Sequence, residues 1–169
     1  MSVVGAVVVL AGCGGGPGGG VEVLSASRDA SASVVVQVLT ELHAIDAPTA
    51  YTVQVHHAGD RARTSQQPVL ALVTPARDTG PDAQVVARLR LEPGEYDVAV
   101  ALRSCGMRAS CPDDPASSDF SGSLWECSVR VPLQEGASVR VRTEDGPAED
   151  SSAARCTVVP DTDAAADAG

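Results

Sequence analysis

The sequence has no lysine and few aromatic residues, and each shortage excludes a class of protein. Twelve arginines stand against 22 acidic residues, which gives a net charge of −10 at pH 7. A chain this acidic, with no cluster of basic residues, does not neutralise nucleic-acid phosphates, so we expect no nucleic-acid partner. Aromatic residues make up only 2% of the 169 residues, so aliphatic side chains must build most of the core.

Long apolar runs and catalytic motifs are missing as well. The longest apolar stretch, residues 2–12 (SVVGAVVVLAG), is shorter than the roughly 20 residues that span a bilayer core. Its length suits the apolar region of a secretory signal peptide, which ends in small residues. The sequence contains no G-x-S-x-G, S-x-x-K, H-E-x-x-H or phosphate-binding glycine motif. We therefore expect neither an enzyme nor a bound cofactor.

What the sequence does contain is a series of short, valine-rich runs with a period of two residues, which favours strands. Only residues 41–46 suggest a turn of helix. Turn signals between the runs indicate an all-β, immunoglobulin-like antiparallel sandwich of seven or eight strands. The expected strands are 33–39, 50–56, 68–74, 84–91, 95–103, 123–131, 138–143 and 154–159, and residues 21–24 suggest a further short one.

Two of these runs show which face is buried. In residues 138–143 the valines alternate with Arg140 and Arg142. In residues 84–91 the polar face carries Gln84, Arg88 and Arg90. One face of each strand is therefore expected to be dry and the other wet, as is usual in antiparallel sheets. The expected dry face of 84–91 holds Val85, Ala87, Leu89 and Leu91, with Val86 as an exception.

The stretch from Leu91 to Val98 (LEPGEYDV) joins two runs through a Pro-Gly pair, which predicts a type II turn. It resembles the L-x-P-G-x-Y-x-V stretch of fibronectin-type-III-like and PEGA-like β-sandwich domains. The resemblance implies that Tyr96 packs at a corner of the sandwich and that its hydroxyl bonds to nearby backbone. It implies a fold and no activity.

Five cysteines is an odd number, and the first of them follows the apolar stretch. Leu10-Ala11-Gly12-Cys13 resembles the lipobox of bacterial lipoproteins. In that family the peptidase cuts before the cysteine, which then carries a diacylglyceryl group on sulfur and an acyl group on nitrogen. The resemblance implies that Cys13 is a lipid anchor, which requires more than one acyl chain to be stable. The alternative is an apolar strand at 2–12 with Cys13 as a structural thiol.

This resemblance sets the expected organisation of the chain. Residues 1–12 are expected to be a lipoprotein signal peptide and 13–32 a lipidated, glycine-rich, flexible tether. The runs with a period of two residues predict a sandwich domain at 33–160, and composition predicts an acidic disordered tail at 161–169. Gly14 takes the place of the aspartate that retains enteric lipoproteins at the inner membrane, so the analogy favours the outer membrane of the cell envelope.

The other four cysteines are an even number in a chain expected to be exported, which predicts two disulfides. Cys127 shares a face with Trp125, and Cys156 is in phase with Val158. Both thiols are therefore expected to point inward from neighbouring strands. This favours a Cys127–Cys156 bond, with Cys105–Cys111 closing a short loop. The alternative, a zinc site of four thiolates, lacks any C-x2-4-C spacing.

Other candidate residues have an ordinary interpretation beside the functional one. His56 and His57, with Asp60 nearby, suggest a metal site or a base, but adjacent strand residues face opposite ways, so we expect an exposed pair. His43 is expected at the surface. The acidic loop suggests calcium, but it lacks EF-hand spacing and is expected to be solvated. Its carboxylates are Asp113, Asp114 and Asp119, and those of Asp161 and Asp163 lie further along.

Together these features predict a membrane-anchored lipoprotein that presents a structural or interaction module in the cell envelope. Its expected partners are membrane lipid, through acylated Cys13, and an envelope protein or polysaccharide. The alternative is a lipoprotein that binds a carbohydrate or another small ligand. Sugar sites generally need exposed aromatic rings, and only Phe120 and Trp125 are candidates, of which Trp125 is assigned to the core.

Overall fold

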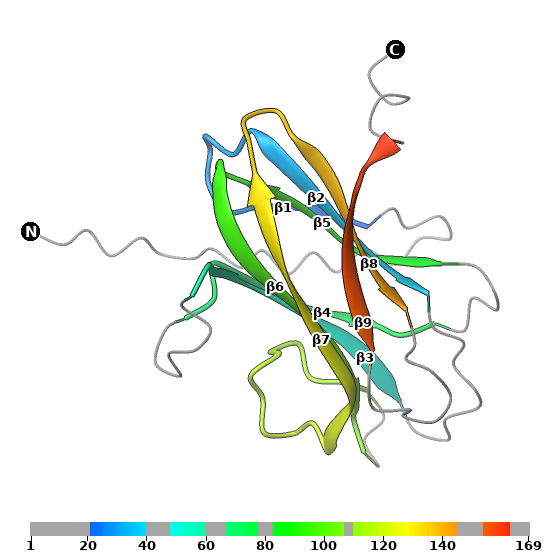
Figure 1. The fold of residues 1–169 in the computed structure, drawn as a ribbon. Coiled ribbons are helices and arrows are strands. Elements are labelled where there is room, and N and C mark those ends of the chain that lie inside the picture. The colour runs from blue at the N-terminus through cyan, green and yellow to red at the C-terminus, as the bar shows by residue number, and fades with distance from the viewer. Residues whose placement is uncertain are drawn as a thin grey trace, which may run out of the picture.

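The structure is a computed structural model that describes residues 21–39, 48–59, 67–77, 83–106, 110–144 and 154–162. Nine strands in the described residues form two packed sheets (Figure 1). This confirms the predicted all-β sandwich, with one strand more than expected. The strands are β1 (Val23–Ser25), β2 (Ala32–Leu39), β3 (Thr49–His57), β4 (Leu70–Pro75), β5 (Gln84–Leu91), β6 (Gly94–Ser104), β7 (Gly122–Leu133), β8 (Ser138–Glu144) and β9 (Arg155–Pro160).

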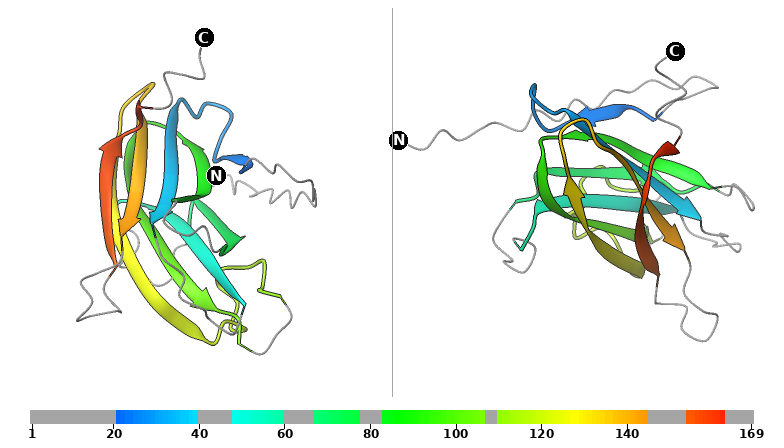
Figure 2. Two further views of the ribbon diagram at one scale, coloured as in Figure 1. Left: turned by 90° about the vertical axis from the view of Figure 1, so that its right-hand side faces the viewer. Right: turned by 45° about the horizontal axis from the view of Figure 1, so that its top comes forward.

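One sheet has five strands in the order β1-β5-β2-β8-β9, and the other has four in the order β4-β3-β6-β7. Figure 2 shows the two layers from the side. The prediction of purely antiparallel pairing is wrong for the five-stranded sheet, because β1 pairs with β5 and β2 with β8 in parallel. A short hairpin forces its strands to run in opposite directions. The chain between β2 and β8 instead passes through the four-stranded sheet, so these strands are free to run the same way.

The core between the sheets is built mainly from valine, as the low aromatic content requires. Val34, Val36, Val53 and Val100 are fully buried and come from both sheets. The few aromatic side chains lie among them, and the Tyr51 and Trp125 rings are tilted with their centroids 6.1 Å apart. The assignment of Trp125 to the core is confirmed, since the residue is buried in the main apolar cluster.

A β-bulge in β5 explains why Val86 breaks the alternation of its strand. Ala87 pairs with Val36 and Val85 with Gln37, so one residue of β5 has no partner opposite it in β2. The extra residue shifts the alternation of inward and outward side chains by one position along β5. Val86 is therefore fully buried, while Val85, predicted on the dry face, shares the outer face with Gln37.

The corner before β6 forms the contact that the sequence resemblance implies, through a different backbone turn. Tyr96 is buried, and its hydroxyl donates a hydrogen bond of 3.1 Å to the carbonyl oxygen of Glu92. The predicted type II turn is wrong, because such a turn needs a positive φ at its glycine. Gly94 is not among the glycines with positive φ and instead begins β6 opposite Leu133.

The strands extend beyond the predicted domain of 33–160. β1 lies within the stretch assigned to the tether and pairs with β5. Asp161 was assigned to the tail, but its backbone N–H donates to the carbonyl oxygen of Ser138 at 3.1 Å. The predicted signal peptide, Cys13, the glycine-rich run, the helical turn at 41–46 and residues 163–169 lie outside the described residues.

Candidate functional site

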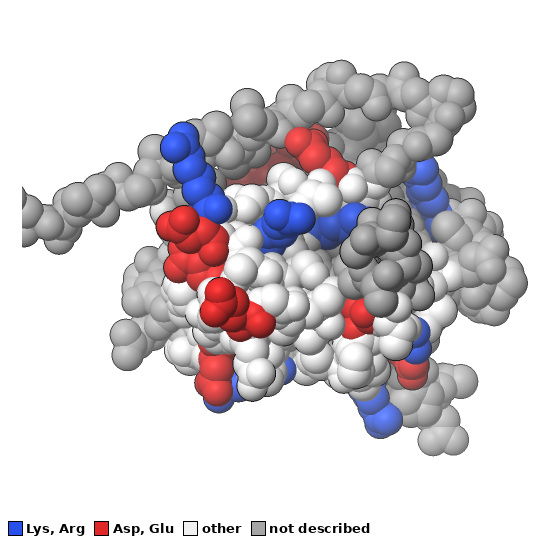
Figure 3. All heavy atoms as spheres, turned by 90° about the horizontal axis from the view of Figure 1, so that it is seen from above, with Lys and Arg blue, Asp and Glu red and all other residues white. Residues whose placement is uncertain are grey.

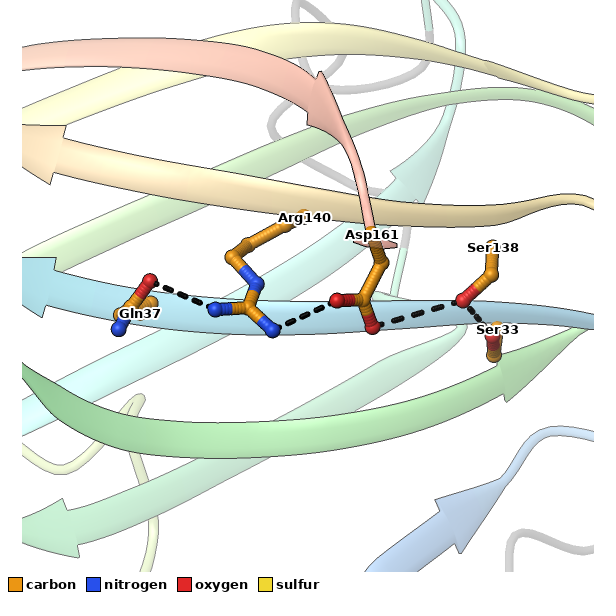
Figure 4. Close-up of polar contacts among 5 residues, drawn as sticks. All are labelled: Ser33, Gln37, Ser138, Arg140 and Asp161. Atoms are coloured by element: carbon orange, nitrogen blue, oxygen red, sulfur yellow. Dashed lines mark hydrogen bonds and ion pairs between the residues drawn. The ribbon is translucent and has the colours of Figure 1, made fainter. Parts of the chain in front are cut away.

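A row of five polar side chains runs along β2 and β8 on the outer face of the five-stranded sheet (Figure 4). Arg140 of β8 is central, with Nη1 donating to Gln37 Oε1 at 3.2 Å and Nη2 donating to Asp161 Oδ1 at 2.6 Å. Ser138 Oγ donates to Asp161 Oδ2 at 3.5 Å, and the Ser33 and Ser138 hydroxyls are 2.7 Å apart. Either hydroxyl can be the donor in that last contact.

Strand register explains why residues so distant in sequence meet here. The parallel pairing of β2 with β8 sets Ser33 beside Ser138 and Gln37 two positions beyond the partner of Arg140. Asp161 follows the last residue of β9, which pairs with Val139. The side chains of Arg140 and Asp161 are only 12% and 4% exposed. An ion pair this well covered is held in one geometry by its hydrogen bonds.

Next to this row lies a groove of about 410 Å³, which we call the outer groove. It lies across β1, β5, β2 and β8, and its lining includes Ser33, Ser138, Arg140 and Asp161. Val35, which is 4% exposed although it faces away from the core, is also part of the lining. The volume is within the range of small-ligand sites.

Arg88 and Arg90 add two further guanidinium groups to the outer groove. Both are exposed, and β-sheet pairing sets Arg88 opposite Val35 and Arg90 opposite Ser33. Neither side chain makes a hydrogen bond or ion pair with the described part of the chain. Figure 3, a view from above, shows basic side chains near the middle of the picture among uncharged atoms.

The sequence assigned these arginines to a wet face but did not predict that they gather at one groove. Alternation within 84–91 and 138–143 puts Arg88, Arg90 and Arg140 on the polar sides of two strands. Only the strand order β5-β2-β8 puts those two sides on one surface. Asp161 was not predicted as a partner of Arg140. Its acidic, small-residue surroundings in the sequence predict disorder from this residue onward.

The cysteine pairs are those that the sequence favoured. Cys105 is bonded to Cys111 and Cys127 to Cys156, with Cα–Cα distances of 5.1 and 5.6 Å. The expected inward direction holds for Cys127, which is 8% exposed. The expectation that the second bond joins neighbouring strands is confirmed, since β7 and β9 lie in contact. β7 and β9 are edge strands of different sheets, so this disulfide connects the two layers.

The histidines and the acidic loop lie away from the outer groove. His57 is exposed and stacks on Tyr96, with ring centroids 5.2 Å apart. His56 was expected to be exposed, but it is buried opposite Asp97, because both faces of β3 are covered. Its Nδ1 atom has no hydrogen-bond partner among the described residues. Asp60 and His43 lie outside those residues.

In the acidic loop, Asp114 Oδ1 accepts a hydrogen bond from the N–H of Ala116 at 2.9 Å. The carboxylates of Asp113, Asp114 and Asp119 belong to exposed residues. The Asp161 carboxylate differs from these three, because it is paired with Arg140. Within the described ranges, no group of three or more His, Cys, Asp or Glu residues is arranged to hold a metal ion.

The two aromatic candidates for a sugar site are both occupied by internal contacts. Trp125 is buried against Tyr51. Phe120 is half-buried, and the guanidinium of Arg103 lies 5.5 Å from its ring centroid. Trp125 therefore offers no open stacking face, and Arg103 lies over the Phe120 ring.

Comparisons with protein families, with curated proteins and with solved structures find no match for this chain. Within its described part, no helix is both long and apolar enough to cross a membrane.

Proposed function

We propose that this protein is a bacterial lipoprotein, anchored through acylated Cys13, that presents its sandwich as a binding module in the cell envelope. The observation that supports it best is the arrangement of the cysteines. Four of the five are paired in disulfides, and such bonds persist in oxidising compartments outside the cytosol. The remaining cysteine is Cys13, at the end of the lipobox-like stretch.

A binding role is proposed because the described residues form a groove lined with hydrogen-bonding side chains. Its side chains are guanidiniums, hydroxyls, one amide and one carboxylate that is already bonded to Arg140. Guanidinium and hydroxyl groups donate hydrogen bonds, so they can hold and orient a ligand. A second candidate, a carrier of a small ligand or carbohydrate, is favoured by the concave shape of the outer groove.

Metabolic labelling with a radioactive fatty acid tests the anchor. We expect label on the wild-type chain and none on Cys13→Ala, because the acyl groups require that residue. Absence of label from the wild type, or equal label on both chains, would contradict the proposal. A pull-down with the lipidated chain tests the binding role, and recovery of no envelope component would count against it.

A further inference from the structure

The outer groove holds more positive than negative charge, although the whole chain is strongly acidic. Its lining includes Arg88, Arg90 and Arg140, against Asp161 as the only carboxylate among the described lining residues. Asp161 is bonded to Arg140 and Ser138. The two cations of β5 have no partner in the described part of the chain, although the sequence holds 22 acidic residues. This charge is therefore available to an anion from outside.

The neutral groups of the groove restrict the kind of anion. Ser33 and Ser138 supply hydroxyls and Gln37 an amide, beside apolar contacts from Val23 and Val35. Arg88 and Arg90 are two residues apart on one face of a strand, which separates their backbones by about 7 Å. The two guanidinium groups can therefore each bind a separate carboxylate of one ligand. A ligand that matches all three features has carboxylates, hydroxyls and small apolar C–H surfaces.

The size and shape of the groove favour an oligosaccharide over a protein partner. At about 410 Å³, it has room for a few sugar rings and lies within the range of small-ligand sites. Stable protein interfaces instead cover much larger, flatter surfaces of about 800 Å² on each partner. Guanidinium groups also suit carboxylates, because each forms two parallel hydrogen bonds with one carboxylate.

We infer that the outer groove binds an acidic oligosaccharide, a uronic-acid segment of an envelope polymer. Arg88 and Arg90 each bind one carboxylate of the ligand. Ser33, Arg140 and Asp161 form hydrogen bonds with the sugar hydroxyls. This inference rests on the proposed function, since it names the ligand of the displayed module. It does not require the fatty-acid label on Cys13, so the two proposals fail independently.

Isothermal titration of the full chain in detergent with trigalacturonate tests the assignment. We expect saturable binding that weakens roughly tenfold or more in Arg88→Gln and in Arg90→Gln, because each removes a charge-assisted hydrogen bond. Arg88→Lys keeps the charge but loses the paired hydrogen bonds, and should show an intermediate affinity. Arg142→Gln is the matched control, because Arg142 is an exposed arginine of β8 outside the groove lining; it should bind as the wild type does.

Four results would overturn the inference. These are no saturable binding by the wild type, an equal loss in Arg142→Gln, binding of inorganic phosphate as tight as that of the sugar, and equally tight binding of a poly-glutamate peptide. The methyl ester of the same oligosaccharide should bind roughly tenfold more weakly, because it lacks the charge that Arg88 and Arg90 would meet. Near-ultraviolet circular dichroism from Trp125 verifies that each variant is folded.

Discussion

At the scale of single residues, Tyr96 joins the core to the segment that precedes β6. Its hydroxyl bonds to Glu92, and burial, with a smaller contribution from the Glu92 carboxylate, raises the pKa of Tyr96 above its ordinary value of 10.0. We expect Tyr96→Phe to lower the free energy of unfolding at pH 7 by about 1 kcal/mol, the usual net contribution of one hydrogen bond. Urea unfolding of both proteins measures the difference.

The same pair of proteins gives a pH prediction. Above about pH 10 the unfolded chain loses the phenol proton while the folded chain still keeps it, so the contribution of Tyr96 falls as pH rises through this window. Below that pH the contribution is complete. The stability difference between wild type and Tyr96→Phe should therefore decrease between pH 9 and pH 11. A difference that stays constant over this range would contradict the assigned environment.

Two glycines of neighbouring turns should respond in opposite ways to alanine. A Cβ at Gly94 would lie 3.5 Å from the nearest Tyr96 ring atom, which is an ordinary contact, and its φ is not positive. Gly94→Ala should be neutral or stabilising by up to about 1 kcal/mol, since it restricts the unfolded chain. Gly136 has a φ of 71°, so Gly136→Ala should cost about 1–2 kcal/mol.

Thermal unfolding of the two alanine variants beside the wild type gives the order directly. A larger loss in Gly94→Ala than in Gly136→Ala would contradict the backbone geometry described for these turns. The type II turn predicted from the sequence would require a positive φ at Gly94, and the structure has none there. Only the backbone φ angle separates Gly136, which requires a glycine, from Gly94, which packs against the Tyr96 ring.

At the scale of strands, periodicity was sufficient to locate the elements. Each of the eight expected strands lies within a few residues of an observed one. Valine-rich runs with alternating polarity favour the extended strand, in which one face is buried. The pairing order was not predictable, since it depends on contacts between distant residues. The bulge at Val86 was visible only as a break in the alternation, and its partner in β2 was needed to explain it.

The inner strands β3 and β6 of the four-stranded sheet have buried residues on their outer face, which leads to a prediction for a small residue of β6. Ala99 faces away from the core, yet it is only 6% exposed. A charged side chain there would be buried without a partner, so Ala99→Glu should lower the free energy of unfolding by at least about 2 kcal/mol.

Ser128→Glu is the matched control for this substitution. Ser128 lies directly opposite Ala99 on β7 and is exposed, so it should change stability by no more than about 0.5 kcal/mol. Chemical denaturation of the two variants separates these outcomes. Similar effects at both positions would show that Ala99 is not covered.

At the scale of the whole molecule, one disulfide connects the two sheets and the other closes a short loop. The sequence separations are 29 residues for Cys127–Cys156 and 6 for Cys105–Cys111. In the loop-entropy account, replacing both cysteines of the longer loop by serine should cost about 3–4 kcal/mol, and of the shorter loop about 2 kcal/mol. Urea unfolding of the two double variants tests this order, and the reverse order would contradict it.

Only the strand faces of the site's arginines could be predicted from the sequence, and the assembly of the site could not. Arg88, Arg90 and Arg140 were assigned to wet strand faces from alternation alone. Their meeting at one groove depends on the parallel pairing of β2 with β8. The role of Asp161 depends on a backbone hydrogen bond to Ser138. The two residues are 23 positions apart, so this contact leaves no local pattern in the sequence. Sites formed between strands that are distant in sequence and adjacent in the sheet are the part that sequence reasoning misses.

The central claim is that one cysteine anchors the chain and four are bonded in the pairs described. Mass spectrometry of the native protein from its membrane, digested without reduction, measures both parts together. We predict an N-terminal peptide that begins at acylated Cys13, and linked peptides for Cys105–Cys111 and Cys127–Cys156. A chain that begins at Met1 with a free thiol at Cys13, or a peptide linking Cys105 to Cys127, would contradict the account.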